Sequence, residues 1–173
     1  MSTQPKAAAA PTAVLRVGAG FFGAAAALLG RHGLKLRAVG PGEEIPGSYW
    51  GAPEAGLMGA VVWVRDDTPV HSLLHEACHA LCMDEARREA LERDAGGDFE
   101  EENAVCRLQI LLAAELEGVG AERLMQDMDA WGYTFRLGSA RAWYTCEAED
   151  ARAWLARRGL IDAGGRVAPP HSA

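Results

Sequence analysis

One segment of the chain, residues 59–65 (GAVVWVR), combines β-branched and aromatic side chains and is therefore predicted to form a strand. Residues 34–39 alternate apolar and basic side chains, which predicts a second, half-exposed strand. Helical patterns dominate the remainder, and helices are predicted at residues 21–32, 69–83 (with a continuation toward 91), 99–117, 121–131 and 147–158. A small sheet accompanied mainly by helices predicts an α+β fold.

The chain is long enough to bury a hydrophobic core of its own, with 173 residues of which 49% are apolar. Residues 1–12 lack periodicity and large apolar side chains, so we expect them to form a disordered leader. Residues 13–173 are expected to form one domain. Its candidate site lies within residues 59–117, and a C-terminal helical part follows at residues 118–160.

The formal net charge of −7 excludes some kinds of partner. Nine acidic against three basic side chains lie between residues 84 and 102, so six of the seven excess negative charges fall in one stretch. Binding to nucleic acid or to an anionic membrane depends on clustered Lys and Arg, and we expect neither. The most apolar run, residues 17–30, is too short to cross a bilayer as a helix.

The four cysteines indicate a reducing compartment. They are too few for a disulfide scaffold and include no Cys-x-x-Cys pair. We therefore expect a cytoplasmic protein, while its oligomeric state stays open.

The motif that carries chemistry is His75-Glu76-Ala77-Cys78-His79, an H-E-x-x-H sequence. On a helix, two imidazoles four residues apart lie on one face and can bind one metal ion. Glu76 lies between them and is positioned to take a proton from a metal-bound water. Asp67-Thr68-Pro69 precedes the motif and predicts a capped helix start, with Pro69 at the first helical position.

A zinc site with an open position needs a third protein ligand, and the next helical pattern begins with three glutamates. Glu101 is the first candidate, because it shares a stripe with the apolar residues 105, 108 and 112 and a charge on such a stripe needs a partner. However, Asp98-x-x-Glu101 is also a capping-box pattern. Glu102, which lies in line with Cys106 and Gln109, is the alternative ligand.

Residues 59–112 resemble the zincin metallopeptidases, and more narrowly their gluzincin branch, in which a glutamate of a second helix completes the site. In several bacterial gluzincin-like families a small residue follows that glutamate after three positions, as Ala104 follows Glu101 here. The chain departs from the pattern at Val105, where those families have Asp or Asn. The metzincin extension is absent, since no histidine follows His79 before His171.

The resemblance implies a zinc-dependent peptidase with Glu76 as general base and a peptide or protein as substrate. Tyr133, or failing that Tyr144, is the candidate hydrogen-bond donor to the oxyanion of the reaction, a role that gluzincins give to Tyr or His. The strand at residues 59–65 would present its edge to an extended peptide, with Trp63 and Arg65 near the substrate.

Two other functions are compatible with the sequence. In the first, the zincin core is a catalytically silent scaffold that binds a partner. In the second, Gly18, Gly20 and Gly23 form the G-x-G-x-x-G turn of a dinucleotide-binding protein. The second lacks the acidic residue that should follow Val39, and no further alternation of strands and helices supports it.

Overall fold

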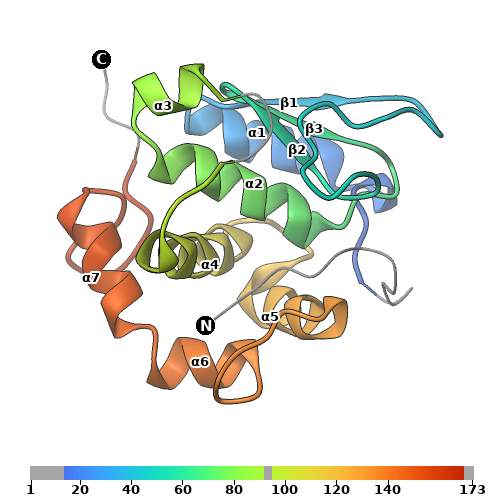
Figure 1. The fold of residues 1–173 in the computed structure, drawn as a ribbon. Coiled ribbons are helices and arrows are strands. Elements are labelled where there is room, and N and C mark those ends of the chain that lie inside the picture. The colour runs from blue at the N-terminus through green and yellow to red at the C-terminus, as the bar shows by residue number, and fades with distance from the viewer. Residues whose placement is uncertain (1–13, 92–94, 170–173) are drawn as a thin grey trace.

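The computed structural model describes residues 14–91 and 95–169, and the predicted leader at residues 1–12 lies outside them. The described part is a mixed α+β structure with seven α-helices and one three-stranded sheet (Figure 1), which confirms the predicted class. A 3-10 helix (Val17–Ala19) precedes the regular elements. These are α1 (Phe22–Arg31), β1 (Lys35–Ala38), β2 (Gly56–Met58), β3 (Val61–Val64), α2 (Val70–Cys82), α3 (Glu85–Glu89), α4 (Phe99–Ala113), α5 (Gly120–Trp131), α6 (Ala140–Cys146) and α7 (Glu149–Arg157).

The sheet has the strand order β1-β3-β2, with β1 parallel and β2 antiparallel to β3. The strand predicted at residues 59–65 is therefore present as β3, but its predicted free edge is wrong. Val62 of β3 is in register with Leu36 on one side and with Leu57 on the other, so no edge is left for a peptide. The sequence did not reveal β2, because three residues are too few for an alternating pattern.

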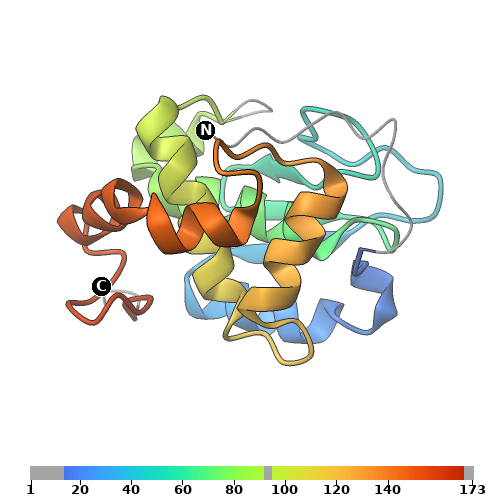
Figure 2. The ribbon, with the colours of Figure 1, turned by 90° about the horizontal axis from the view of Figure 1, so that it is seen from below.

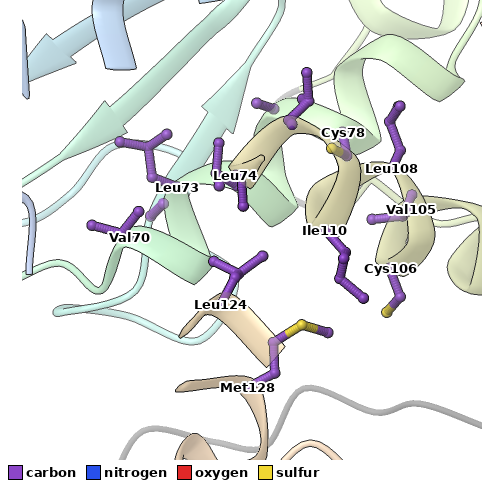
Figure 3. Packing of buried hydrophobic residues seen from close by; sticks show 14 of the residues in the cluster. Val70, Leu73, Leu74, Cys78, Val105, Cys106, Leu108, Ile110, Leu124 and Met128 are labelled. Carbon is purple, nitrogen blue, oxygen red and sulfur yellow. The ribbon is translucent and has the colours of Figure 1, made fainter. Parts of the chain in front are cut away.

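Helix α2, which carries the H-E-x-x-H motif, lies between the sheet and helices α4 and α5 (Figure 1). Eleven of its 13 residues are buried, as expected for a helix that is covered on nearly all sides. It packs on β2 and β3 on one side and on α4 and α5 on the other. Figure 2 shows α5 and α6 nearer the viewer than the sheet and α7 to one side, and Figure 3 shows apolar side chains of α2, α4 and α5 meeting in the core.

The boundaries of α2 differ from the prediction at both ends. Pro69 is the capping residue and not the first helical residue, and no side chain caps this end. The two polar residues of the predicted helix start have other partners: Thr68 Oγ1 accepts the backbone N–H of Arg65 at 2.8 Å, and Asp67 forms an ion pair with Arg65, with 2.6 Å between Oδ2 and Nη2. At the other end the helix does not continue toward residue 91, because Asp84 caps the separate helix α3 by accepting the backbone N–H of Arg87.

The glycine motif near the N-terminus does not follow a strand in the described part of the chain. Arg16 forms only an isolated bridge with Pro69, and residues 17–19 form the 3-10 helix. A dinucleotide-binding turn needs a strand directly before it, so the geometry gives this alternative no support. No helix in residues 14–91 and 95–169 has both the length and the apolar character that a membrane span needs.

Candidate metal centre

Three side chains from two helices meet at one point: His75 and His79 of α2 and Glu102 of α4. The Nε2 atoms of the two histidines are 3.2 Å apart. The Glu102 carboxylate lies 3.1 Å from His75 Nε2 through Oε1 and 3.3 Å from His79 Nε2 through Oε2. Zinc binds nitrogen and oxygen ligands at about 2.0–2.1 Å in a tetrahedron, which corresponds to ligand atoms about 3.3 Å apart. The three side chains therefore already have the spacing of a zinc ligand set.

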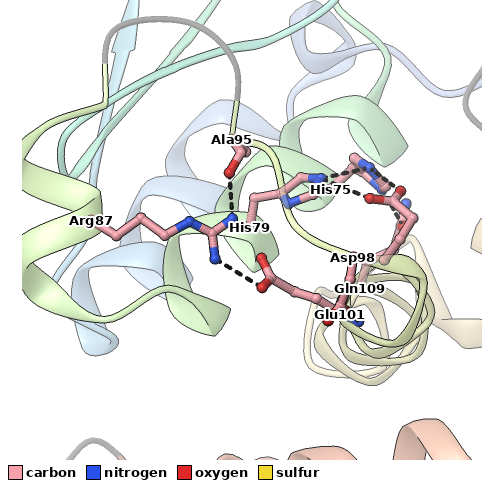
Figure 4. Close-up of polar contacts among 8 residues, drawn as sticks. His75, His79, Arg87, Ala95, Asp98, Glu101 and Gln109 are labelled. Atoms are coloured by element: carbon pink, nitrogen blue, oxygen red, sulfur yellow. Dashed lines mark hydrogen bonds and ion pairs between the residues drawn. The ribbon is translucent and has the colours of Figure 1, made fainter.

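Glu101, the first candidate for the third ligand, lies elsewhere, and this prediction is corrected. Its Oε2 accepts a hydrogen bond of 2.8 Å from Arg87 Nη1, and Arg87 also donates to the carbonyl oxygen of Ala95 (Figure 4). The backbone N–H of Glu101 donates to Asp98 Oδ1, so Asp98 caps α4. The capping pattern seen in the sequence therefore forms in part: Asp98 does cap the helix, while the Glu101 side chain pairs with Arg87. The alternative ligand, Glu102, is the one that faces the histidines.

Burial and charge strongly shift the protonation of this cluster. Both histidines are buried, and the Glu102 side chain is 29% exposed. Burial lowers the pKa of His75, but the nearby Tyr133 and Glu102 outweigh burial and raise it well above its ordinary value. Burial likewise raises the pKa of Glu102, yet His75 and His79 together hold it well below its ordinary value. The cluster thus favours a negative carboxylate that faces a positive charge, which a proton or a metal ion can supply.

Gln109 of α4 determines which nitrogen of His75 carries a proton. Its side-chain Nε2 donates to the backbone carbonyl oxygen of His71 at 3.0 Å, and a carbonyl can only accept. Its Oε1 therefore points to His75 Nδ1, which donates to it at 2.9 Å. With the proton on Nδ1, a neutral His75 presents a lone pair from Nε2 to Glu102 and His79, which is the arrangement that a metal ligand needs. Nδ1 of His79 is buried and has no such partner among the described residues.

Glu76, the candidate general base, is half-buried on α2 between the two histidines. The net effect on the pKa of Glu76 is a rise above its ordinary value, mainly because of burial. The charges of His79 and His75 oppose this rise, and the carboxylates of Glu54 and Glu102 add to it. A raised pKa makes a carboxylate a better proton acceptor near neutral pH.

Tyr133 contacts the site, but on a different side from the one expected. Its ring lies edge-on to His75 with 5.9 Å between ring centres, and its hydroxyl lies 3.2 Å from Nδ1 of His71. The hydroxyl thus lies beside His71, which is not one of the three candidate ligands, and the oxyanion role of Tyr133 stays a prediction. Tyr144 stacks with the guanidinium of Arg107, 4.6 Å from its ring centre.

The two residues expected near a peptide substrate have other contacts. The Trp63 ring lies 5.8 Å from the guanidinium of Arg37, which comes from the neighbouring strand β1. Arg65 donates to the Asp67 carboxylate and to the carbonyl oxygen of Glu43. Neither contact involves the metal centre.

A buried polar network behind the site was missed by the sequence analysis. Glu54, which is fully buried in the loop before β2, accepts hydrogen bonds from Ser72 Oγ at 2.6 Å and from Trp131 Nε1 at 2.8 Å. The Trp131 ring in turn packs 5.1 Å from His71. The spacing of His71, one helical turn before His75, could have indicated that its side chain lies near the site. No pattern marked Glu54, since it lies in a segment rich in Gly and Pro.

Comparisons with protein-family models, with curated proteins and with solved structures find no match to this chain. The functional argument therefore depends on the residues themselves.

Proposed function

We propose that this protein is a metal-dependent hydrolase that binds one zinc ion through His75, His79 and Glu102. The observation that carries the proposal is the orientation of His75. Gln109 holds one proton on Nδ1, so Nε2, which points to a carboxylate and to a second imidazole, is the nitrogen that takes up either a second proton or a metal ion. Electron pairs that converge in a buried place repel each other unless a cation lies among them. Two imidazoles and one carboxylate with an open fourth position favour zinc.

The neighbouring residues supply what a hydrolytic site needs beyond its ligands. Bound zinc supplies a Lewis acid that lowers the pKa of a water molecule toward neutrality. Glu76 accepts the proton from that water, since its pKa is raised by burial and it lies beside both histidines. Gln109 holds His75 in place by accepting a hydrogen bond from Nδ1, on the side away from Nε2, and the Tyr133 ring packs edge-on against the same imidazole.

A peptide bond is the substrate that we propose, on the strength of the zincin resemblance of the motif. The cytoplasm is the compartment that we propose, in line with four cysteines that remain free thiols in the structure. The dinucleotide-binding alternative is not carried further, since the glycines follow no strand in the described residues.

One observation favours a second candidate, a zincin-like scaffold that holds metal without catalysis. Both edges of β3 are paired, so the strand addition expected of a peptidase substrate cannot occur there. In a scaffold the metal would stabilise the contact between α2 and α4.

Two measurements test the proposal. The first compares zinc content in the purified protein, in His75→Ala and in a control variant, His32→Ala, whose histidine lies at the end of α1. We expect about one zinc per chain in the parent and in the control, and much less in His75→Ala. Equal zinc in all three would refute the metal centre.

The second measurement separates hydrolase from scaffold. Glu76→Gln should retain zinc and lose most of the hydrolysis rate on a library of internally quenched peptides, because the general base is removed. If Glu76→Gln kept the parent rate, Glu76 would not be the base. A parent protein that binds zinc but cleaves no peptide would favour the scaffold.

A further inference from the structure

A cleft of about 1000 Å³ lies between the start of α4, residues 134–136, α6 and α7. Three aromatic side chains line it: Phe99 of α4, Phe135, and Trp143 of α6. Phe135 and Trp143 pack against each other with 5.3 Å between ring centres. Phe99 is 53% exposed and offers apolar surface to the cleft.

The cleft is connected to the metal centre through two segments. On α4, Phe99 lies one turn before Glu102 and Asn103 directly follows it, so the wall of the cleft and the third ligand share one helical turn. After α5, Phe135 stacks on Tyr133 with 6.5 Å between ring centres and 9° between ring planes. Tyr133 is the residue whose ring contacts His75. The cleft is therefore joined to the proposed site of hydrolysis through α4 and through the Phe135–Tyr133 pair, although the three candidate ligands do not line it.

The polar groups of the cleft indicate what kind of occupant it takes. Oδ1 of Asn103 is buried and accepts no hydrogen bond within the described residues, so it needs a donor such as a peptide N–H. The charged groups around the cleft nearly balance, with Glu100, Glu147 and Asp150 against Arg136 and Arg157. Arg136 and Glu147 also pair with each other. The cleft has an aromatic lining, little net charge and one acceptor, Asn103 Oδ1, without a hydrogen-bond partner among the described residues. This combination fits an uncharged peptide segment with a large apolar side chain.

We propose that this cleft binds a large apolar side chain of the peptide substrate, aromatic or long aliphatic, and that it sets the specificity of the site. This inference rests on the proposed function for the identity of the substrate, whereas binding in the cleft can be measured without metal and without turnover. Asn103 accepts a backbone N–H of the bound peptide, and Phe99 covers its apolar side chain.

The test uses two short peptides, N-acetyl-Gly-Phe-Gly-amide and N-acetyl-Gly-Ala-Gly-amide, titrated into the full-length protein. The readout is the indole N–H resonance of Trp143 in a two-dimensional NMR spectrum, assigned with the variant Trp143→Phe among the five tryptophans of the chain. We expect the Phe peptide to shift this resonance to saturation, and the Ala peptide to bind at least about fivefold more weakly because it buries less apolar surface.

A matched pair of substitutions locates the binding. Phe99→Ala should weaken binding of the Phe peptide by about fivefold or more. Phe22→Ala removes a half-exposed Phe from the start of α1 and should leave that affinity unchanged. The inference would be overturned if both peptides shifted the Trp143 resonance equally, or if the shifts were spread evenly over all indoles. It would also be overturned if both substitutions weakened binding of the Phe peptide equally. A protein that passes this test but binds no zinc would refute the proposed function and leave the cleft as a peptide-binding site.

Discussion

The adjacent residues Glu101 and Glu102 allow a sharp test of the metal centre, because the same substitution can be made at each. Glu102 faces His75 and His79 at 3.1 and 3.3 Å, whereas Glu101 pairs with Arg87 at 2.8 Å. Zinc at 100 times its dissociation constant should stabilise the parent protein by about 2.7 kcal/mol. For a chain of this length that raises Tm by about 5–10 °C.

The two variants should differ in how much zinc raises their Tm. Loss of a ligand weakens zinc binding by at least about 100-fold. The same zinc concentration then adds only about 0.4 kcal/mol to Glu102→Gln, which is a rise of about 1–2 °C. Glu101→Gln should keep the full rise and lose only about 0.5–1 kcal/mol of metal-free stability with its partly exposed ion pair.

Thermal unfolding by circular dichroism, with and without zinc after removal of bound metal, measures all three proteins. The reasoning is refuted if Glu101→Gln loses the zinc-dependent rise and Glu102→Gln keeps it. A parent protein whose Tm does not respond to zinc would refute the metal centre as a whole.

Three further predictions concern the surroundings of the site. Gln109→Met removes the acceptor of His75 Nδ1 and should weaken zinc binding by about 10–100-fold, measured by competition with a chelator. The free energy of unfolding of the metal-free protein, measured in urea, should fall as pH rises from about 6.5 through the raised pKa of His75. A group whose pKa is higher in the folded state stabilises the fold only while it is protonated. Zinc should suppress this loss. A thiol reagent should modify the exposed Cys146 rapidly and Cys78 not at all before unfolding, because burial raises the pKa of the Cys78 thiol well above its ordinary value.

The sequence predicted five of the seven described helices, α1, α2, α4, α5 and α7, and the shared helical face of His75 and His79, because each depends on local signals; it did not predict α6 or the separate helix α3. The pattern from residue 69 to 83 contains the whole of α2, and the H-E-x-x-H spacing places both imidazoles on one face of it. The strands β3 and β1 were equally visible in the sequence, but β2 was not. Whether the edge of β3 is free depends on β2, which pairs with it through only three residues. Long-range pairing of that kind leaves no local signal.

The third ligand was harder to predict because α4 is buried on more than one side. The stripe argument placed Glu101 with Val105 and Leu108 and assumed that this core stripe faces α2. In the structure α4 packs against α2, α5 and α7 at once, and nine of its 15 residues are buried. A helix of that kind has several apolar stripes, so periodicity alone cannot identify the one that meets the histidines.

Gln109 gives independent support for Glu102, because both residues depend on one register between α2 and α4. Glu102 lies opposite His79 and His75, and Gln109, two turns later, lies opposite His75 and His71. The two helices are therefore antiparallel. A step of two turns forward along α4, from Glu102 to Gln109, corresponds to a step of about one turn back along α2. A rotation of α4 that brought Glu101 to the histidines would turn Gln109 away from α2 and leave the buried Nδ1–H of His75 without its acceptor. The hydrogen bonds of Gln109 and the placement of Glu102 are thus parts of a single arrangement.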